Sequence, residues 1–174
     1  MRQLSDAGSA DQGCVPILLH FDGIHWAQQA IHTDTSPIGL QIAGLAMVSP
    51  TDGWAVGTYL GGMSPAYPPS AVVVRCHAGS WIEVARYAAP AGVGVFALNA
   101  VAVTAKRDGW ALGTGGLHLR LHGGGPTPDT AQSSVAAQPN LWGVAMSSLG
   151  DGWAVGDHGT ILRYHGAGCN AYTP

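Results

Sequence analysis

The chain has 174 residues, of which 26 are glycine and 47% are hydrophobic, while only 10% are charged. This composition is typical of a compact protein with many turns, and it excludes a disordered chain. The formal net charge of −3, with only seven lysines and arginines, gives no electrostatic reason to expect a nucleic-acid partner.

Both ends of the chain are predicted to be tails, residues 1–16 and 170–174. The first residues lead into a polar segment with no apolar core, so we expect no signal peptide. No run of about 18 uninterrupted apolar residues occurs, so we expect no transmembrane helix and no membrane insertion. The compartment stays open at this point.

The first predicted strands lie just after the N-terminal tail. Leu18 to Asp22 is an apolar segment that ends in an acidic residue, and Trp26 starts a second strand after a glycine-containing turn. We interpret residues 17–30 as the outer strands of a partial repeat unit. Trp26, and Trp81 at the matching place in the next unit, are expected to pack between units.

A six-residue phrase then occurs three times, at 52–57, 108–113 and 151–156. It reads Asp-Gly-Trp-Ala-Val-Gly, with Leu for Val in the second copy, and apolar residues precede it at period two, which indicates a strand. Asp-Gly between two alternating runs is a strong hairpin signal, because glycine tolerates the positive φ of tight turns. In the strand that follows, Trp54 and Val56 should share one face and Ala55 the other. The repeated residues are therefore expected to form turns (Asp52, Asp108, Asp151) and to pack between units (Trp54, Trp110, Trp153).

The repeat predicts the architecture. Asp108 and Asp151 lie 43 positions apart, and four short antiparallel strands in about 43 residues match one blade of a β-propeller. The predicted blades are 42–87 with an inserted loop at 58–70, 98–136, and 141–169, which lacks a clear outer strand. The fold class is thus an all-β propeller of four-stranded antiparallel blades with about three blades present. Because propellers have about 4 to 8 blades, we expect a partial or fragmentary ring, completed by missing blades or by a homo-oligomer.

The third unit, from Leu141 to Gly166, resembles the propeller repeats of the photosystem II stability and assembly factor family, which are related to the bacterial neuraminidase (Asp-box) repeats. The resemblance implies a bacterial scaffold that binds a protein partner, and an extracellular or cell-envelope location. The match departs from an Asp-box, because His77, His122 and His165 stand where that motif has an acid.

We can assemble no catalytic, metal-binding or cofactor-binding set. Arginines and histidines recur on the third strand of each unit, but equivalent positions of neighbouring blades should diverge from the axis, which favours a structural role. Glu83 is the only glutamate, and most glycosidases need two carboxyl groups at the scissile bond. Two alternatives stay open: a carbohydrate-binding or sialidase-like glycosidase module that uses Glu83, and a truncated propeller fragment without independent function.

Two features are candidates for partner binding. The loop at 58–70 makes the first unit eleven residues longer than the third, and loops on a rigid scaffold concentrate recognition. Its candidate contacts are Tyr59, Met63 and Tyr67. Trp142 stands where the other units have Ala43 and Asn99, on the expected ring surface.

Three cysteines complete the analysis. Cys76 falls inside a predicted strand and should be a small buried residue. Cys14 and Cys169 lie near the two ends, and the spacing does not decide whether they form a disulfide.

Overall fold

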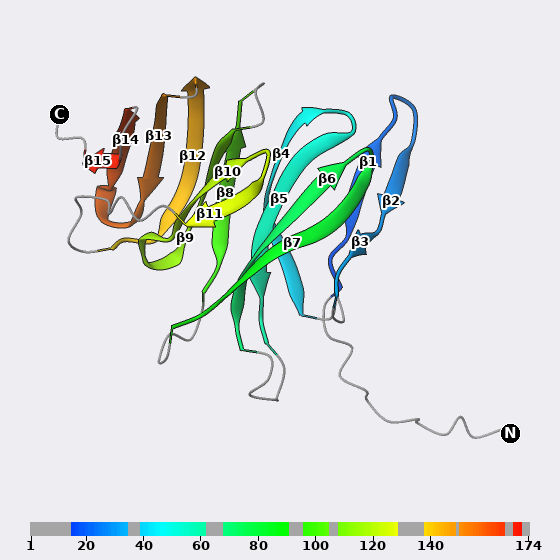
Figure 1. Ribbon diagram of the computed structural model, residues 1–174, viewed down its shortest axis with the longest axis horizontal. Coiled ribbons are helices and arrows are strands. Elements are labelled where there is room, and N and C mark those ends of the chain that lie inside the picture. Colours follow the sequence, from blue (N-terminus) through cyan, green and yellow to red (C-terminus); the bar gives the residue numbers. More distant parts are fainter. Residues whose placement is uncertain are drawn as a thin grey trace, which may run out of the picture.

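The computed structural model describes residues 15–34, 39–61, 68–90, 96–104, 108–128, 138–148 and 150–165, and the backbone of 169–171. These residues form fifteen strands and two single-turn 3₁₀ helices. The sheets stand side by side in an arc, from the N-terminal hairpin at one end to the C-terminal sheet at the other (Figure 1). The predicted all-β class is confirmed.

The N-terminal part is a hairpin followed by a short strand. The hairpin joins β1 (Leu18–Phe21) and β2 (Trp26–Gln29), which pair antiparallel in a sheet of their own. The short strand β3 (Ile31–His32) runs parallel to β7 at the edge of the next sheet.

Three larger sheets follow, which we number as blades 1 to 3. Blade 1 contains β4 (Leu40–Ser49), β5 (Asp52–Tyr59), β6 (Ser70–His77) and β7 (Ser80–Ala88). Blade 2 contains β8 (Leu98–Val103), β9 (Gly109–Gly113), β10 (His118–His122) and β11 (Gly125–Pro128), with η1 (Thr114–Gly116) after β9. Blade 3 contains β12 (Leu141–Ser148), β13 (Asp151–Gly156), β14 (Ile161–His165) and β15 (Cys169–Ala171), with η2 (Asp157–Gly159) after β13.

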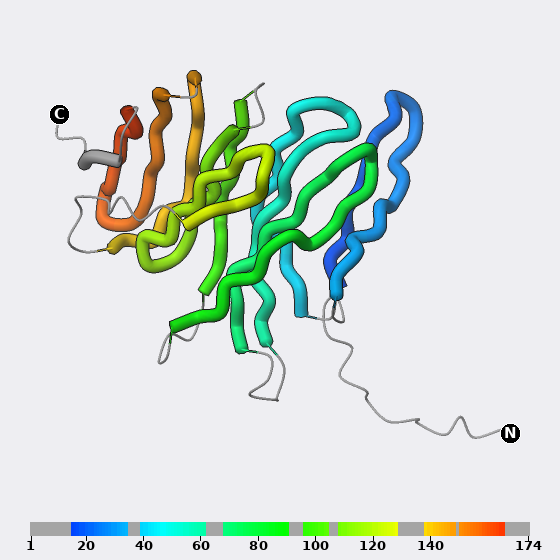
Figure 2. Tube along the Cα trace, viewed as in Figure 1, coloured from blue at the N-terminus to red at the C-terminus, as the bar shows by residue number. Residues whose placement is uncertain are grey.

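Consecutive strands pair antiparallel in every blade, and the first strands β4, β8 and β12 contact one another along the arc. The chain trace repeats the same path in each blade (Figure 2). This is the arrangement of a partial β-propeller, as predicted. Blade 3 also has the short fourth strand β15, which the sequence did not reveal. The boundaries 42–87, 98–136 and 141–169 remain predictions.

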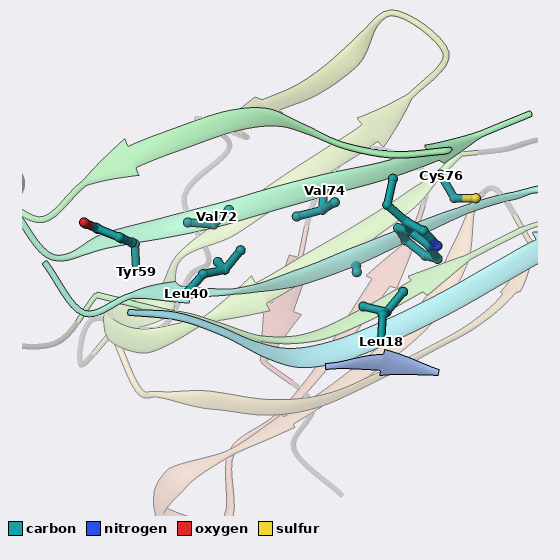
Figure 3. Packing of buried hydrophobic residues seen from close by; sticks show 8 residues of the cluster. Leu18, Leu40, Tyr59, Val72, Val74 and Cys76 are labelled. Carbon is teal, nitrogen blue, oxygen red and sulfur yellow. The ribbon is translucent and has the colours of Figure 1, made fainter. Parts of the chain in front are cut away.

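Apolar side chains fill three junctions between neighbouring sheets. The first junction lies between the β1–β2 hairpin and blade 1, where Leu18 faces the cluster (Figure 3). The second joins blades 1 and 2, and the third joins blades 2 and 3. Trp54 and Val56 lie in the second junction and Ala55 in the first, which confirms the predicted division of the β5 faces.

The exposure of each tryptophan depends on whether a further sheet covers it. Trp54 and Trp110 are only 1% and 4% exposed, but Trp153 at the same repeat position is 37% exposed, because no described blade follows blade 3. Trp81 is buried as predicted. The same prediction is wrong for Trp26, which is 67% exposed and contacts Phe21 with ring centroids 5.1 Å apart.

The Asp-Gly pair does not form the turn, which corrects the prediction. β4 ends at Ser49 and β5 starts at Asp52, so the turn residues precede the pair. Gly53 has no positive φ. A Cβ there would lie 2.5 Å from Met47 Sδ and 2.7 Å from the Ala46 carbonyl oxygen. The glycine is required because neighbouring strands approach closely at this point.

In blades 1 and 3 the repeated Asp instead pairs with an arginine of the third strand. Arg75 Nη2 lies 3.0 Å from Asp52 Oδ1, and its guanidinium lies 4.3 Å from the Trp54 ring centroid. In blade 3, Arg163 Nε lies 3.1 Å from Asp151 Oδ1. These arginines thus have the structural role expected for them, since each ties the second strand of its blade to the third.

Cys76 is 1% exposed, which confirms its predicted burial. Cys14 and the side chain of Cys169 lie outside the described residues, so their pairing stays open.

Candidate functional site

One edge of the arc carries Trp142 and the stems of the inserted loop; it is the edge at which β5, β9 and β13 end and β6, β10 and β14 begin. We call it the lower end. Blades 1 and 2 meet there, since the Thr58 hydroxyl lies 3.1 Å from the Phe96 carbonyl oxygen. Blades 2 and 3 meet there as well, because the Gly116 amide donates to the Pro139 carbonyl at 2.9 Å.

Trp142 is the exposed aromatic residue of this end. It lies at the start of the innermost strand β12 and is 56% exposed. Its indole Nε1 donates to Asp157 Oδ1 at 2.6 Å, so the ring is held in one orientation although half of it meets solvent. A fixed, exposed indole is a ready contact surface, because little side-chain entropy is lost when a ligand covers it.

Hydrogen bonds across blades 2 and 3 position Asp157, the residue that accepts the hydrogen bond from Trp142. Asn140 Nδ2 donates to Asp157 Oδ2 at 2.9 Å, and the Asn140 amide oxygen accepts from the Gly115 amide at 3.0 Å. Asn99 Nδ2 donates to the Leu141 carbonyl at 2.9 Å. The side chains around Trp142 are therefore positioned by contacts between two blades.

The hydrogen bond from Trp142 is the main reason why the pKa of Asp157 lies below its ordinary value of 3.8, and Asn140 lowers it further. Asp157 is thus an anion at neutral pH. The next residue, His158, is exposed and has a φ of 57°, whereas the corresponding residue of η1 is Gly115, with a φ of 61°. A non-glycine residue in the left-handed region of φ costs about 1–2 kcal/mol. His158 therefore lies next to the Asp157 carboxylate in a strained backbone conformation.

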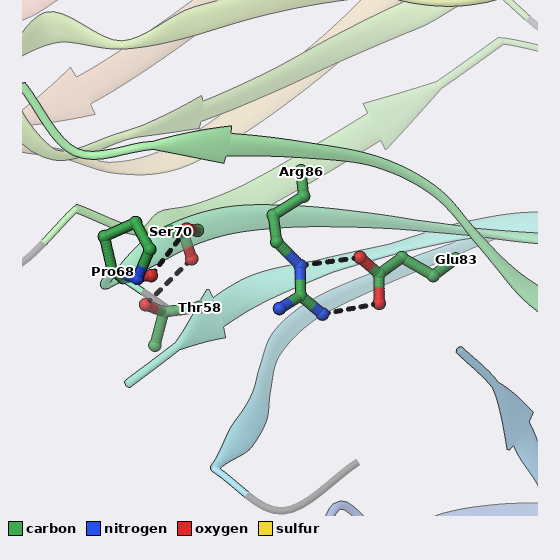
Figure 4. Close-up of polar contacts among 5 residues, drawn as sticks. All are labelled: Thr58, Pro68, Ser70, Glu83 and Arg86. Atoms are coloured by element: carbon green, nitrogen blue, oxygen red, sulfur yellow. Dashed lines mark hydrogen bonds and ion pairs between the residues drawn. The ribbon is translucent and has the colours of Figure 1, made fainter. Parts of the chain in front are cut away.

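The inserted loop is anchored at both stems. The Thr58 hydroxyl lies 3.3 Å from the Ser70 carbonyl oxygen, and the Ser70 hydroxyl donates to the Pro68 carbonyl at 2.8 Å (Figure 4). Tyr59 is 6% exposed, packs in the first junction and has the Arg86 guanidinium 4.3 Å from its ring centroid. Its burial disfavours direct contact with a partner. Met63 and Tyr67 lie outside the described residues.

Glu83 is held by an arginine. Arg86 Nε and Nη2 donate to the two carboxylate oxygens of Glu83 at 2.8 and 2.9 Å (Figure 4). Both side chains are largely buried, 22% and 12% exposed for Arg86 and Glu83. Both carboxylate oxygens of Glu83 are therefore occupied by the guanidinium of a neighbouring residue on the same strand.

A hollow of about 520 Å³ lies between blade 1 and the β10–β11 turn. Its polar lining includes Arg75 and His77. Trp54 Nε1 and Arg75 Nε lack hydrogen-bond partners but are covered by other atoms, and Arg75 is already paired with Asp52. In this lining His77 is exposed, whereas the Arg75 guanidinium is held by Asp52.

No protein family model matches the chain, and no curated protein matches it in sequence. Among solved structures it is similar to one described as "YCF48 bound to D1 peptide", with a TM-score of 0.57 and 16% identity. The match covers 81% of this chain and 42% of the other, so this chain spans less than half of that protein's length. At this identity the likeness shows a shared β-propeller fold and no more. The link to Asp-box repeats stays a prediction.

The described part of the chain holds no group of three or more histidine, cysteine or acidic side chains placed to bind a metal. In the same residues, no helix is long and apolar enough to cross a bilayer.

Sequence reasoning proposed Trp142 as a candidate contact but missed Asn140 and Asp157, the residues that hold its indole in place. Asn140 and Asp157 lie 17 positions apart and meet only because β12 and β13 pair. One signal was present: Asp157 directly follows the third repeat phrase, where the second copy has Thr114.

Proposed function

We propose that this chain is a non-catalytic β-propeller scaffold that binds a protein partner at its lower end. Trp142 is the principal contact, and the segment it recognises is an extended peptide that carries lysine or arginine. The observation that carries the proposal is the 56% exposure of an indole whose Nε1 is fixed by Asp157 at 2.6 Å.

The charge of the site favours a basic segment. Asp157 is anionic at the edge of the Trp142 ring, and the chain has a net charge of −3. A cation above an indole gains about 0.5–2 kcal/mol, and a nearby carboxylate adds to that attraction. An acidic peptide would meet repulsion from the same carboxylate.

Two further observations support a binding role. The solved propeller with the same fold is described as bound to a peptide, which supports a peptide as the ligand class here. The resemblance to assembly-factor repeats supports a protein partner. The pairing of Glu83 with Arg86 favours a scaffold over the glycosidase alternative.

The test compares labelled twelve-residue peptides that differ only in charge, with arginine in one and glutamate in the other, by fluorescence anisotropy. We expect saturable binding of the arginine peptide, a loss of about twofold to thirtyfold in affinity with Trp142→Ala, and partial retention with Trp142→Phe.

Trp26→Ala is the matched control, because Trp26 is also exposed but lies on the β1–β2 hairpin. Equal binding of both peptides, or equal losses with Trp142→Ala and Trp26→Ala, would overturn the proposal.

A further inference from the structure

The hollow between blade 1 and the β10–β11 turn has a volume of about 520 Å³, and small-molecule sites usually measure about 300–1,000 Å³. At the next junction, Tyr164 packs against Trp110 with ring centroids 4.7 Å apart. The residue at the same repeat position in blade 2 is Leu121, which packs with Trp54. Because leucine is smaller than tyrosine, the Trp54 ring borders the hollow. All residues that line the hollow belong to the described part of the chain.

The polar side chains of the lining are hydrogen-bond donors. Arg75 and His77 come from β6 and Trp54 from β5, and no aspartate or glutamate is among the described residues that line the hollow. An indole N–H and a guanidinium can only donate. Trp54 Nε1 and Arg75 Nε have no acceptor among the described residues. The lining therefore suits a ligand that supplies acceptor oxygens.

Arg75 has one side of its guanidinium left for such a ligand. Asp52 accepts from Nη2, and the Trp54 ring supports the group at 4.3 Å. Nη1 has no hydrogen-bond partner among the described residues, and it is not one of the atoms that the protein covers. A guanidinium held in one orientation binds a carboxylate well, because little side-chain entropy is lost.

The walls of the hollow are apolar. They include Val84 and Ala85 of β7 and Pro126 of β11. Strand β7 bulges here: Glu83 pairs with Val74 and Ala85 with Val73, so Val84 has no partner on β6. Val84 is 44% exposed. Bulges often lie beside binding sites, because they redirect a side chain.

Glycines form the rim on the side of blade 2. A Cβ at Gly123 would have nothing within 4 Å, and its φ is not positive, so neither crowding nor conformation requires glycine there. The turn is nevertheless held in place, since the Gly124 amide donates to His122 Nδ1 at 3.2 Å. A fixed turn without side chains lets a ligand approach the backbone closely.

We propose that the hollow binds a small organic acid that has an apolar body. Its carboxylate accepts hydrogen bonds from Arg75 Nη1 and from His77, and its apolar part lies against Val84, Ala85 and Pro126. This site is separate from the peptide site at the lower end, because none of its lining residues belongs to the surroundings of Trp142.

The test titrates phenylacetate into ¹⁵N-labelled full chain and follows the backbone amides by nuclear magnetic resonance. We expect saturable shifts at Val84 and Gly123, and none there with phenethylamine, which has a similar shape and the opposite charge. Acetate should bind at least about tenfold more weakly than phenylacetate, because it lacks the apolar body. The twelve-residue glutamate peptide should not bind at these amides.

Val84 offers a pair of variants that separates charge from shape. Val84→Asp should weaken phenylacetate binding by at least about fivefold, because it places a second negative charge at the hollow. Val84→Lys should retain the affinity or raise it. The residue is 44% exposed, so both variants should fold. Val155→Asp is the matched control on blade 3, where Val155 is 49% exposed, and should leave the affinity unchanged, as should Trp142→Ala.

Four results would overturn the proposal: no shift at Val84 or Gly123 with phenylacetate in excess, equal binding of phenethylamine, equal losses with Val84→Asp and Val84→Lys, or equal losses with Val84→Asp and Val155→Asp. Tighter binding of the glutamate peptide than of phenylacetate at the same amides would also contradict it, because the ligand would then be a peptide.

Discussion

Replacing Trp54 with alanine should destabilise the protein far more than the same change at Trp153, although both residues occupy one repeat position. Trp54 is 1% exposed, and its side chain lies between blades 1 and 2. Removing a buried tryptophan leaves a cavity and costs about 3–5 kcal/mol of unfolding free energy. Its loss also removes the ring beneath the Arg75 guanidinium.

At Trp153 the expected cost is about 1–2 kcal/mol, because the side chain is already 37% exposed and none of the described strands covers its outer face. The difference of about 2 kcal/mol should separate the urea midpoints by about 1 M, for a slope of about 2 kcal/mol/M. Circular dichroism during urea unfolding measures both midpoints.

Trp26→Ala is the control and should change stability by no more than about 0.5 kcal/mol, since the residue is 67% exposed. Equal midpoints for Trp54→Ala and Trp153→Ala would refute the reasoning, because they would mean that burial between blades does not determine the contribution of the repeat tryptophan.

Three further predictions follow from the same contacts. Gly109→Ala should destabilise the protein by about 1–3 kcal/mol, measured by urea unfolding, because the new Cβ would clash with the backbone of β8. Glu83→Gln should cost about 1–3 kcal/mol in the same assay, because it leaves the largely buried Arg86 without its anionic partner. Trp142 fluorescence should change as the pH falls below 3.8 through the lowered pKa of Asp157, because protonation weakens the carboxylate as acceptor of the hydrogen bond from the indole N–H. Asp157→Asn should remove that change.

Each of these three has a result that would contradict it. Gly123→Ala is the matched control for Gly109→Ala and should leave the midpoint unchanged, because nothing lies within 4 Å of a new Cβ at Gly123 and its φ is not positive. An unchanged midpoint for Gly109→Ala would therefore refute the steric argument. Because the pKa of Asp157 is lowered in the folded protein, the ionised carboxylate contributes fully to stability above the ordinary pKa of 3.8. This contribution is lost as the pH falls through the lowered pKa. An acid-induced change that persists in Asp157→Asn would assign it to another group.

The repeat allowed the fold and the division of strand faces to be predicted, because both depend on local spacing. Alternation alone placed Trp54 and Ala55 on opposite faces of β5. The reason for the Asp-Gly pair was not accessible, since it depends on how closely β4 approaches Gly53 and on the distance to Arg75. Both are contacts between strands and leave no spacing signal in a single sequence.

The candidate site was predicted only in part, and exposure explains why. Trp142 stood out because the other units have small or polar residues there. The burial of Tyr59 and the exposure of Trp26 depend on which sheets stand beside them. A repeat pattern gives every unit the same expected neighbours, so it cannot show where a neighbour is absent.

The central claim, that Trp142 is the contact for a basic peptide, is tested most directly by nuclear magnetic resonance of the tryptophan indole groups. The arginine peptide would be titrated into ¹⁵N-labelled protein, with the Trp142 and Trp26 signals assigned from Trp142→Phe and Trp26→Phe. The account predicts a saturable shift of the Trp142 indole signal, with the Trp26 signal unchanged. A shift at Trp26 alone, or no shift at any indole when the peptide is in excess, would contradict it.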